Sequence, residues 1–131
     1  MGAKGLDIYV APLEVCNHAF VDAASLEEIK ALGRVGEMIY GLNSQYELND
    51  ADADAGKRIY DALTAAMLLE PDLFEVKEAY VAVDTKGPYT YGASVMDFEG
   101  FFGQKANAKI AVKVDRQPFK NWLLAAIAQA K

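Results

Sequence analysis

The sequence contains a single cysteine, Cys16, so a disulfide within the chain is excluded. A lone cysteine fits the reducing cytoplasm, where disulfides are rare. There is no run of 18 apolar residues, the length that a membrane-spanning helix needs, and no apolar stretch of signal-peptide length near the start. These absences predict a cytoplasmic protein with no membrane partner.

An excess of positive charge is also absent. Thirteen lysine and arginine residues stand against 19 aspartate and glutamate residues, which gives a net charge of −6. Binding to nucleic-acid phosphates requires a basic face, so nucleic acid is not an expected partner. Hydrophobic residues make up 53% of the 131 positions, and a chain of this length buries roughly two-thirds of its unfolded surface. The composition therefore predicts one globular domain, residues 1–131.

Hydrophobic periodicity in the first half predicts a strand and then a helix. Residues 6–11 form a short apolar run before Pro12, which is typical of a buried strand, and residues 12–24 are expected to form a loop or short turn. Ser25 followed by Glu28 has the spacing of a capping box, so a helix is expected from residue 25 to about residue 46. Gly33 and Gly36 would each weaken that helix by roughly 1 kcal/mol unless they admit a close backbone approach.

The second half predicts the remaining elements. An apolar stripe from residue 59 indicates a helix that Pro71 stops. Residues 76–85 and 89–98 are expected to form a hairpin around a turn at 86–88, followed by a loop at 99–107. Alternation over 108–114 predicts a half-buried strand, and residues 118–130 an amphipathic helix. The order β-α-α-β-β-β-α predicts an α/β fold, a mixed β-sheet with helices packed on it.

Several motifs carry a family resemblance. Residues 58–74 begin with Arg-Ile-Tyr-Asp and end with Glu-Pro-Asp-Leu-Phe, and they follow an Ala-Pro-Leu-Glu-Val segment at 11–15. The hairpin motifs Val-Asp-Thr-Lys-Gly, Thr-Tyr-Gly and Val-Met-Asp follow in order at 83–97. Together they resemble the C-terminal part of the inosine–uridine-preferring nucleoside hydrolases over nearly the whole chain. The resemblance implies that part of their fold, and hydrolysis of the N-glycosidic bond of ribonucleosides in purine and pyrimidine salvage.

Two adjacent residues are the site candidates that the resemblance implies. Asp61 matches an aspartate that is a calcium ligand in the family, so calcium is the implied metal. Tyr60 matches a histidine that helps the leaving base depart; a phenol is a weaker proton donor at neutral pH but can stack on a purine. From the residues alone, Asp61 can equally be an acid near the positive end of a helix. Tyr60 can equally be a half-buried aromatic residue where that helix begins.

The family's Asp-rich loop, Asp-x-Asp-x-x-x-Asp-Asp, has no counterpart in the sequence. In the family it supplies most of the calcium carboxylates and the base that activates water, and the Asn and Glu residues that hold the ribose would lie before Met1. The acidic stretch at 50–54 has three alternating aspartates, as in an EF-hand, but Gly56 falls one position late and Asp61 replaces the bidentate glutamate. It is interpreted as a solvated loop. No complete catalytic site, and no calcium bound by this chain alone, is therefore expected.

Residues after the first predicted strand are further candidates. Glu14, Asn17 and His18 occupy the kind of position where open α/β sheets bind ligands, although ordinary surface residues occupy it too. Cys16 has no base arranged beside it in sequence and is interpreted as a small buried hydrophobic residue.

Three functional hypotheses follow. The leading one is a nucleoside hydrolase-like chain that is inactive alone and accepts a nucleoside only when its site is completed. In the second, a complementary N-terminal half arrives as a separate chain. The third is a non-catalytic oligomerisation or interaction module. A homo-oligomer is expected because uncovered apolar edges pair with other chains, through strand 6–11, helix 25–46 or the loop that carries Phe101 and Phe102.

Overall fold

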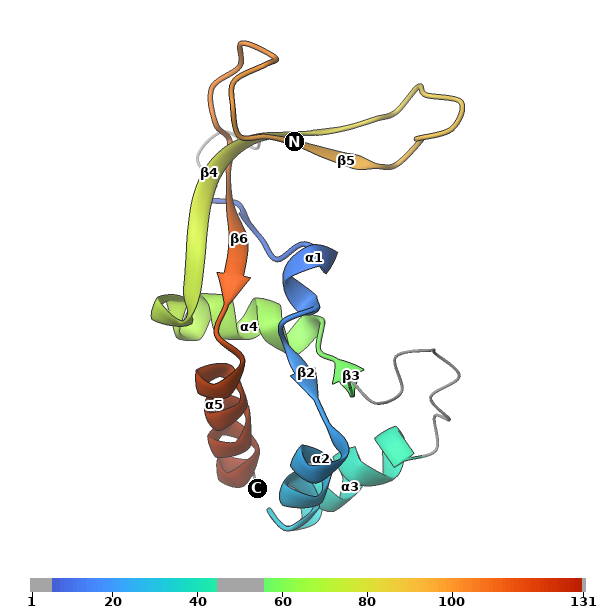
Figure 1. Cartoon of the computed structure of the whole chain (residues 1–131), viewed down its shortest axis with the longest axis vertical. Helices are drawn as coiled ribbons and strands as arrows, with labels where there is room; N and C mark the ends of the chain where they lie inside the picture. Colours follow the sequence, from blue (N-terminus) through green and yellow to red (C-terminus); the bar gives the residue numbers. More distant parts are fainter. Residues whose placement is uncertain (1–5, 45–55, 131) are drawn as a thin grey trace.

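A four-stranded sheet occupies one end of the molecule and most of the helices the other (Figure 1). The computed structural model describes residues 6–44 and 56–130. The sheet has the order β1-β6-β4-β5, formed by β1 (Tyr9–Val10), β6 (Ala108–Val114), β4 (Phe74–Val83) and β5 (Ser94–Asp97). β1 runs parallel to β6 and the other pairs are antiparallel, so the predicted α/β class with a mixed sheet is confirmed.

The described helices are α1 (Leu13–Cys16), α2 (Ala23–Lys30), α3 (Arg34–Ser44), α4 (Asp61–Leu69), the 3₁₀ turn η2 (Pro71–Leu73) and α5 (Arg116–Gln129). Three of them, α1, α4 and α5, pack around the end of β6, and α2 and α3 pack against α5 farther from the sheet (Figure 1). A short antiparallel pair, β2 (Phe20–Val21) with β3 (Lys57–Arg58), links the segment after α1 to the start of α4. The main core lies where α1, α4 and α5 meet β6, and includes Val15, Cys16, Leu63, Met67, Val114 and Phe119. None of the described helices is long and apolar enough to cross a bilayer.

The predictions for the second half are largely confirmed. α4 ends at Leu69, two residues before Pro71, because a proline ring clashes with the preceding turn of a continuing helix. β6 buries Ile110 and Val114 as the alternation indicated, but Val112 on the same predicted face is only partly buried and Ala111 is buried as well. The predicted hairpin forms, but its return strand is only Ser94–Asp97, shorter than the predicted 89–98.

The predicted buried strand at 6–11 is wrong in extent and burial. Only Tyr9 and Val10 pair, with Lys109 and Ile110 of β6, and Leu6 is 69% exposed. β1 is the edge strand of the described sheet, so one side has no neighbour to bury it. A short apolar run forms a buried strand only where another strand or helix also covers its open edge.

The predicted loop at 12–24 contains α1, β2 and the start of α2, and the predicted helix at 25–46 is two helices. The break follows Lys30, and Gly33 adopts φ +91°, a conformation that favours glycine. A Cβ at Gly36 would overlap the carbonyl oxygen of Ile29, so the close backbone approach expected at one of the two glycines occurs at Gly36. That approach requires α3 to fold back on α2.

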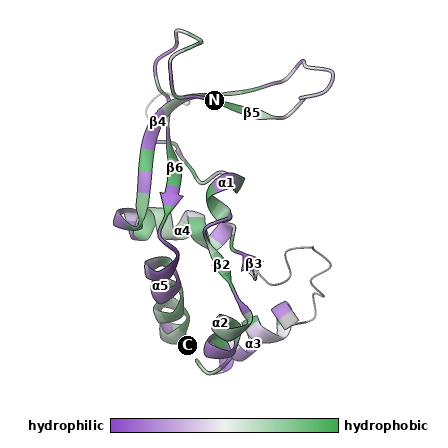
Figure 2. Ribbon diagram, viewed as in Figure 1, coloured by the Kyte–Doolittle hydropathy of each residue, from purple (hydrophilic) through white to green (hydrophobic). Residues whose placement is uncertain are grey.

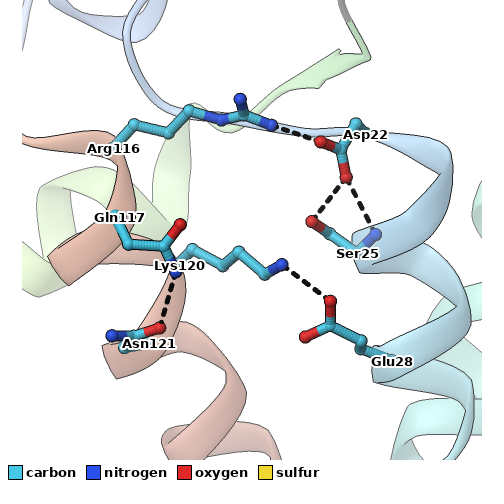
Figure 3. Close-up of polar contacts among 7 residues, drawn as sticks. All are labelled: Asp22, Ser25, Glu28, Arg116, Gln117, Lys120 and Asn121. Carbon is cyan, nitrogen blue, oxygen red and sulfur yellow. Dashed lines mark hydrogen bonds and ion pairs between the residues drawn. The ribbon is translucent and has the colours of Figure 1, made fainter.

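The first residue of α2 is fixed by Asp22, not by a capping box at Ser25. The Asp22 carboxylate accepts hydrogen bonds from the Ser25 backbone N–H at 2.8 Å and from the Ser25 hydroxyl at 2.6 Å (Figure 3). Its other oxygen accepts from the Arg116 guanidinium at 2.5 Å, and that guanidinium lies over the Phe20 ring at 3.7 Å. Lys120 adds an ion pair to Glu28 at 2.8 Å. Together these contacts tie α5 to α2.

We expect Asp22→Asn to destabilise the fold at neutral pH by about 0.5–1 kcal/mol, because asparagine can still cap α2 but loses the charge that pairs with Arg116 in a partly exposed ion pair. Bonds from Ser25 first, and then from Arg116, hold the pKa of Asp22 well below its ordinary value. The stabilisation is therefore complete above the unfolded-state pKa, near ~4, and is lost as the pH falls through the lower folded-state value.

Urea unfolding of both proteins between pH 7 and pH 2 measures this effect. The difference in unfolding free energy should be largest at pH 7 and should narrow below about pH 4. Asp115→Asn is the matched control, because Asp115 is the N-cap of α5 but makes no side-chain cap hydrogen bond. Equal losses of unfolding free energy in the two variants at pH 7 would show that the contacts of Asp22 with Ser25 and Arg116 do not stabilise the fold.

Candidate functional site

An open groove of about 810 Å³ lies where β1 runs into α1, beside the start of α4 and the faces of β5 and β6. Its walls are largely apolar, and Figure 2 shows apolar stretches on α1, α4 and β5, elements that border it. The lining residues are Val10, Ala11, Pro12, Leu13, Glu14, Val15, Cys16, Tyr60, Asp61, Thr64, Ser94, Met96, Phe98, Ile110, Ala111 and Val112. The groove thus contains both residues predicted as site candidates.

Tyr60 and Asp61 are positioned by contacts on both sides of the pair. Upstream, β3 pairs with β2, and the Ile59 N–H donates to the Ala19 carbonyl oxygen at 2.7 Å. Downstream, one face of α4 is anchored in the core by three buried residues, Leu63, Ala66 and Met67. The backbone at the start of α4 is therefore held firmly, while the side chains of Tyr60 and Asp61 stay exposed at the groove.

Tyr60 also borders a second, smaller hollow of about 310 Å³. Glu14 lines both hollows, and Asn17 and Arg58 line the smaller one. Two of the three polar candidates after the first strand, Glu14 and Asn17, therefore lie near Tyr60. His18 is exposed and lines neither hollow, so the structure does not bring it to this site.

Cys16 lies in the wall of the groove but belongs to the core. Its side chain is buried, and its thiol donates to the Pro12 carbonyl oxygen at 3.5 Å. Burial raises the pKa of the Cys16 thiol, which keeps it protonated and poorly nucleophilic. The interpretation of Cys16 as a small buried hydrophobic residue is confirmed.

The groove does not fit a calcium ion by itself. Calcium takes six to eight oxygen ligands, and Asp61 supplies one carboxylate. In residues 6–44 and 56–130, no three His, Cys, Asp or Glu side chains come together in a way that could hold a metal ion. The acidic stretch at 50–54 lies outside the described residues. The assignments of Asp61 to a metal and of Tyr60 to a substrate therefore stay predictions.

Sequence reasoning missed part of the groove. Thr64 stands one turn after Tyr60 on the same face of α4, so helical spacing was a usable signal. Ser94, Met96 and Phe98 form another wall. No local pattern indicates that wall, because it depends on how β5 pairs with the outer part of β4.

Comparison with known proteins identifies the fold. The family model for the inosine-uridine preferring nucleoside hydrolases matches residues 2–121. The chain belongs to this family. The resemblance predicted from residues 58–74 and from the hairpin motifs is thereby confirmed. The chain is 36% identical over 127 residues to the non-specific ribonucleoside hydrolase RihC of Salmonella typhimurium.

Solved structures agree on the architecture. A purine-preferring ribonucleoside hydrolase from Gardnerella vaginalis superposes with a TM-score of 0.80 at 21% identity, and a plant nucleoside hydrolase with 0.79 at 20%. They cover 95% and 96% of this chain, which in turn covers 40% and 42% of theirs. The match to Salmonella RihC spans 97% of this chain but 41% of the relative. The described fold therefore corresponds to one part of a nucleoside hydrolase.

Proposed function

We propose that this chain is the C-terminal part of a nucleoside N-ribohydrolase and is inactive alone. The observation that carries the proposal is the extent of the match, nearly all of this chain against about two-fifths of Salmonella RihC. A complementary part, covalently joined or on a second chain, supplies the remainder of the active site. The substrates are ribonucleosides, as the family membership implies.

The chemistry explains why a complement is needed. Hydrolysis of an N-glycosidic bond requires an activated water molecule and negative charge near the oxocarbenium-like centre that develops on the ribose. The only carboxylates lining the described groove belong to Glu14 and Asp61, and among the described residues they do not join a third acidic, His or Cys side chain in a group that could hold a metal ion. Asp61 would supply one carboxylate to the completed site, including one oxygen ligand for calcium, and Tyr60 an aromatic face for the base.

The proposed docking surface for the complement is the outer edge of β1 together with the groove beside it. Parallel strands normally lie inside a sheet that is covered on both faces. Here the parallel strand β1 is at the edge, and no described strand pairs with its outer side. An added strand at this edge would bury Tyr9, which is 37% exposed, and bring the complement over Tyr60 and Asp61.

The test measures release of base from inosine and from uridine. We expect none from the purified chain, with or without calcium. Adding the part of Salmonella RihC outside the matched 127 residues should restore release. Turnover by the chain alone, abolished by Asp61→Asn, would show that this chain builds a complete site and would overturn the proposal. Binding of the complement without any restored release would instead favour the non-catalytic module.

A further inference from the structure

Thr64 lies in the groove but has no part in the proposed function. It stands on α4 one turn after Tyr60, and its side chain is exposed at the groove. In residues 6–44 and 56–130, no side chain or backbone group forms a hydrogen bond with the Thr64 hydroxyl. The hydroxyl can therefore bond to a ligand without first breaking a contact within the described part of the chain.

The geometry of α4 places Thr64 beside Tyr60. The Thr64 N–H donates to the Tyr60 carbonyl oxygen at 3.4 Å, so the turn between the two residues is helical. Side chains four residues apart lie on one face of a helix, with Cβ atoms roughly 5–6 Å apart, and lean toward the N-terminal turn. A planar base whose face packs on the Tyr60 ring would therefore have its edge toward Thr64, because a neighbour of that ring lies beside the stack and not above it.

The rest of the groove offers a base few hydrogen-bond donors. Met96 and Phe98 form an apolar wall, and the Cys16 thiol already donates to a backbone carbonyl oxygen. The two carboxylates of the groove accept hydrogen bonds but donate none when ionised. Thr64 and Ser94 carry the only aliphatic hydroxyls that line the described groove. Ligand sites are typically apolar with a few placed polar groups that fix the orientation of the ligand.

Of the two hydroxyls, that of Thr64 is held more firmly beside Tyr60. Its neighbours Leu63, Ala66 and Met67 are buried in the core at 0–1% exposure, so α4 cannot turn about its axis. Ser94 is the first residue of β5, on a different wall of the groove. A hydrogen bond discriminates between ligands only when the protein group is held in place, which a buried helix achieves better than the end of a strand.

We propose that Thr64 determines specificity for the base, because its hydroxyl hydrogen-bonds the polar group on the edge of the base away from the ribose. This inference rests on the proposed function, since the complement must hold the ribose beside Asp61. A hydroxyl can donate to a carbonyl oxygen or accept from an amino group. Thr64 therefore favours purine nucleosides with either group at position 6 over a purine nucleoside that has only hydrogen there.

Hydrolysis of three purine nucleosides by the completed enzyme tests this role. The completed enzyme is this chain with the part of Salmonella RihC outside the matched 127 residues. Inosine carries an oxygen at position 6, adenosine an amino group and purine riboside only hydrogen. Thr64→Val keeps the shape of the side chain but leaves the polar group of the base unpaired. We expect kcat/KM for inosine and for adenosine to fall about tenfold relative to kcat/KM for purine riboside.

Two further variants separate a lost hydrogen bond from an effect on the fold. Thr64→Ser retains the hydroxyl and should restore the preference for inosine over purine riboside to within about threefold of the wild-type value. Thr85→Val is the matched control, because Thr85 is an exposed threonine that lines neither hollow. It should leave kcat/KM for all three nucleosides within about twofold of the wild-type values.

Unchanged kcat/KM in Thr64→Val, or an equal loss for all three nucleosides, would refute the role of Thr64 and leave the proposed function standing. If the completed enzyme releases no base, the proposed function fails, and isothermal titration of the complex with inosine and purine riboside tests Thr64 separately. Inosine that binds about tenfold more weakly to Thr64→Val, relative to purine riboside, would support the role. Inosine that binds both proteins equally, or neither, would refute it.

Discussion

Asp61→Asn should lower kcat/KM for inosine at least 100-fold in the enzyme completed by the rest of Salmonella RihC. The asparagine side chain would occupy the same space in the groove but carry no charge. The completed site would lose a carboxylate that opposes the positive charge developing on the ribose, and a neutral amide is a weaker ligand than a carboxylate for a hard cation such as calcium. A 100-fold loss corresponds to about 2.7 kcal/mol of transition-state stabilisation.

The control for this experiment is Asp72→Asn. Asp72 is an exposed aspartate of η2 that lines neither hollow, so its loss of charge should change kcat/KM less than twofold. Steady-state assays of base release on the wild-type complex and both variants, with complex formation verified by sedimentation, make the comparison. Equal activity of Asp61→Asn and the wild type would show that Asp61 has no role in the completed active site. The family assignment would not be affected.

Phe119→Ala should cost about 3–5 kcal/mol of unfolding free energy, a large part of the roughly 5–15 kcal/mol that stabilises a typical domain. Phe119 is 1% exposed and stacks on Trp122 with ring centroids 5.9 Å apart. It belongs to the cluster that joins α5 to α1, α4 and β6, so its removal leaves a cavity beneath the groove. The loss should therefore weaken the position of Tyr60 and Asp61 as well as the fold.

Urea unfolding at low protein concentration measures this loss. Leu42→Ala provides the comparison, because Leu42 is an exposed helical residue and alanine is a good helix former, so a change below about 0.5 kcal/mol is expected. A loss under 1 kcal/mol for Phe119→Ala would mean that α5 does not pack on this core.

Hydrophobic periodicity predicted an element correctly where one face of that element packs on the core. The stripe from Ile59 to Met67 and the stop at Pro71 predicted α4 because helical periodicity records which face meets the core. The alternation at 108–114 predicted β6 because successive side chains of a strand point to opposite faces of the sheet. The pattern failed at 25–46, where the break near Gly33 depends on α3 folding back on α2 at Gly36. It also failed at Asp22, whose partner Arg116 lies 94 residues away.

The candidate site also has a part that the sequence predicted and a part that only the tertiary structure shows. The sequence alone was enough to find the family, the helix that begins at Asp61 and the adjacent pair Tyr60 and Asp61, because these follow from consecutive residues. The tertiary structure decided that Glu14 shares their groove, that Met96 and Phe98 form a wall of it, and that β1 is an edge. The wall that Met96 and Phe98 form depends on the change of partner along β4 from β6 to β5. Contacts between segments distant in the sequence decide which strand β4 pairs with. Hydrophobic periodicity indicates only which residues of one element are buried, so it cannot predict that pairing.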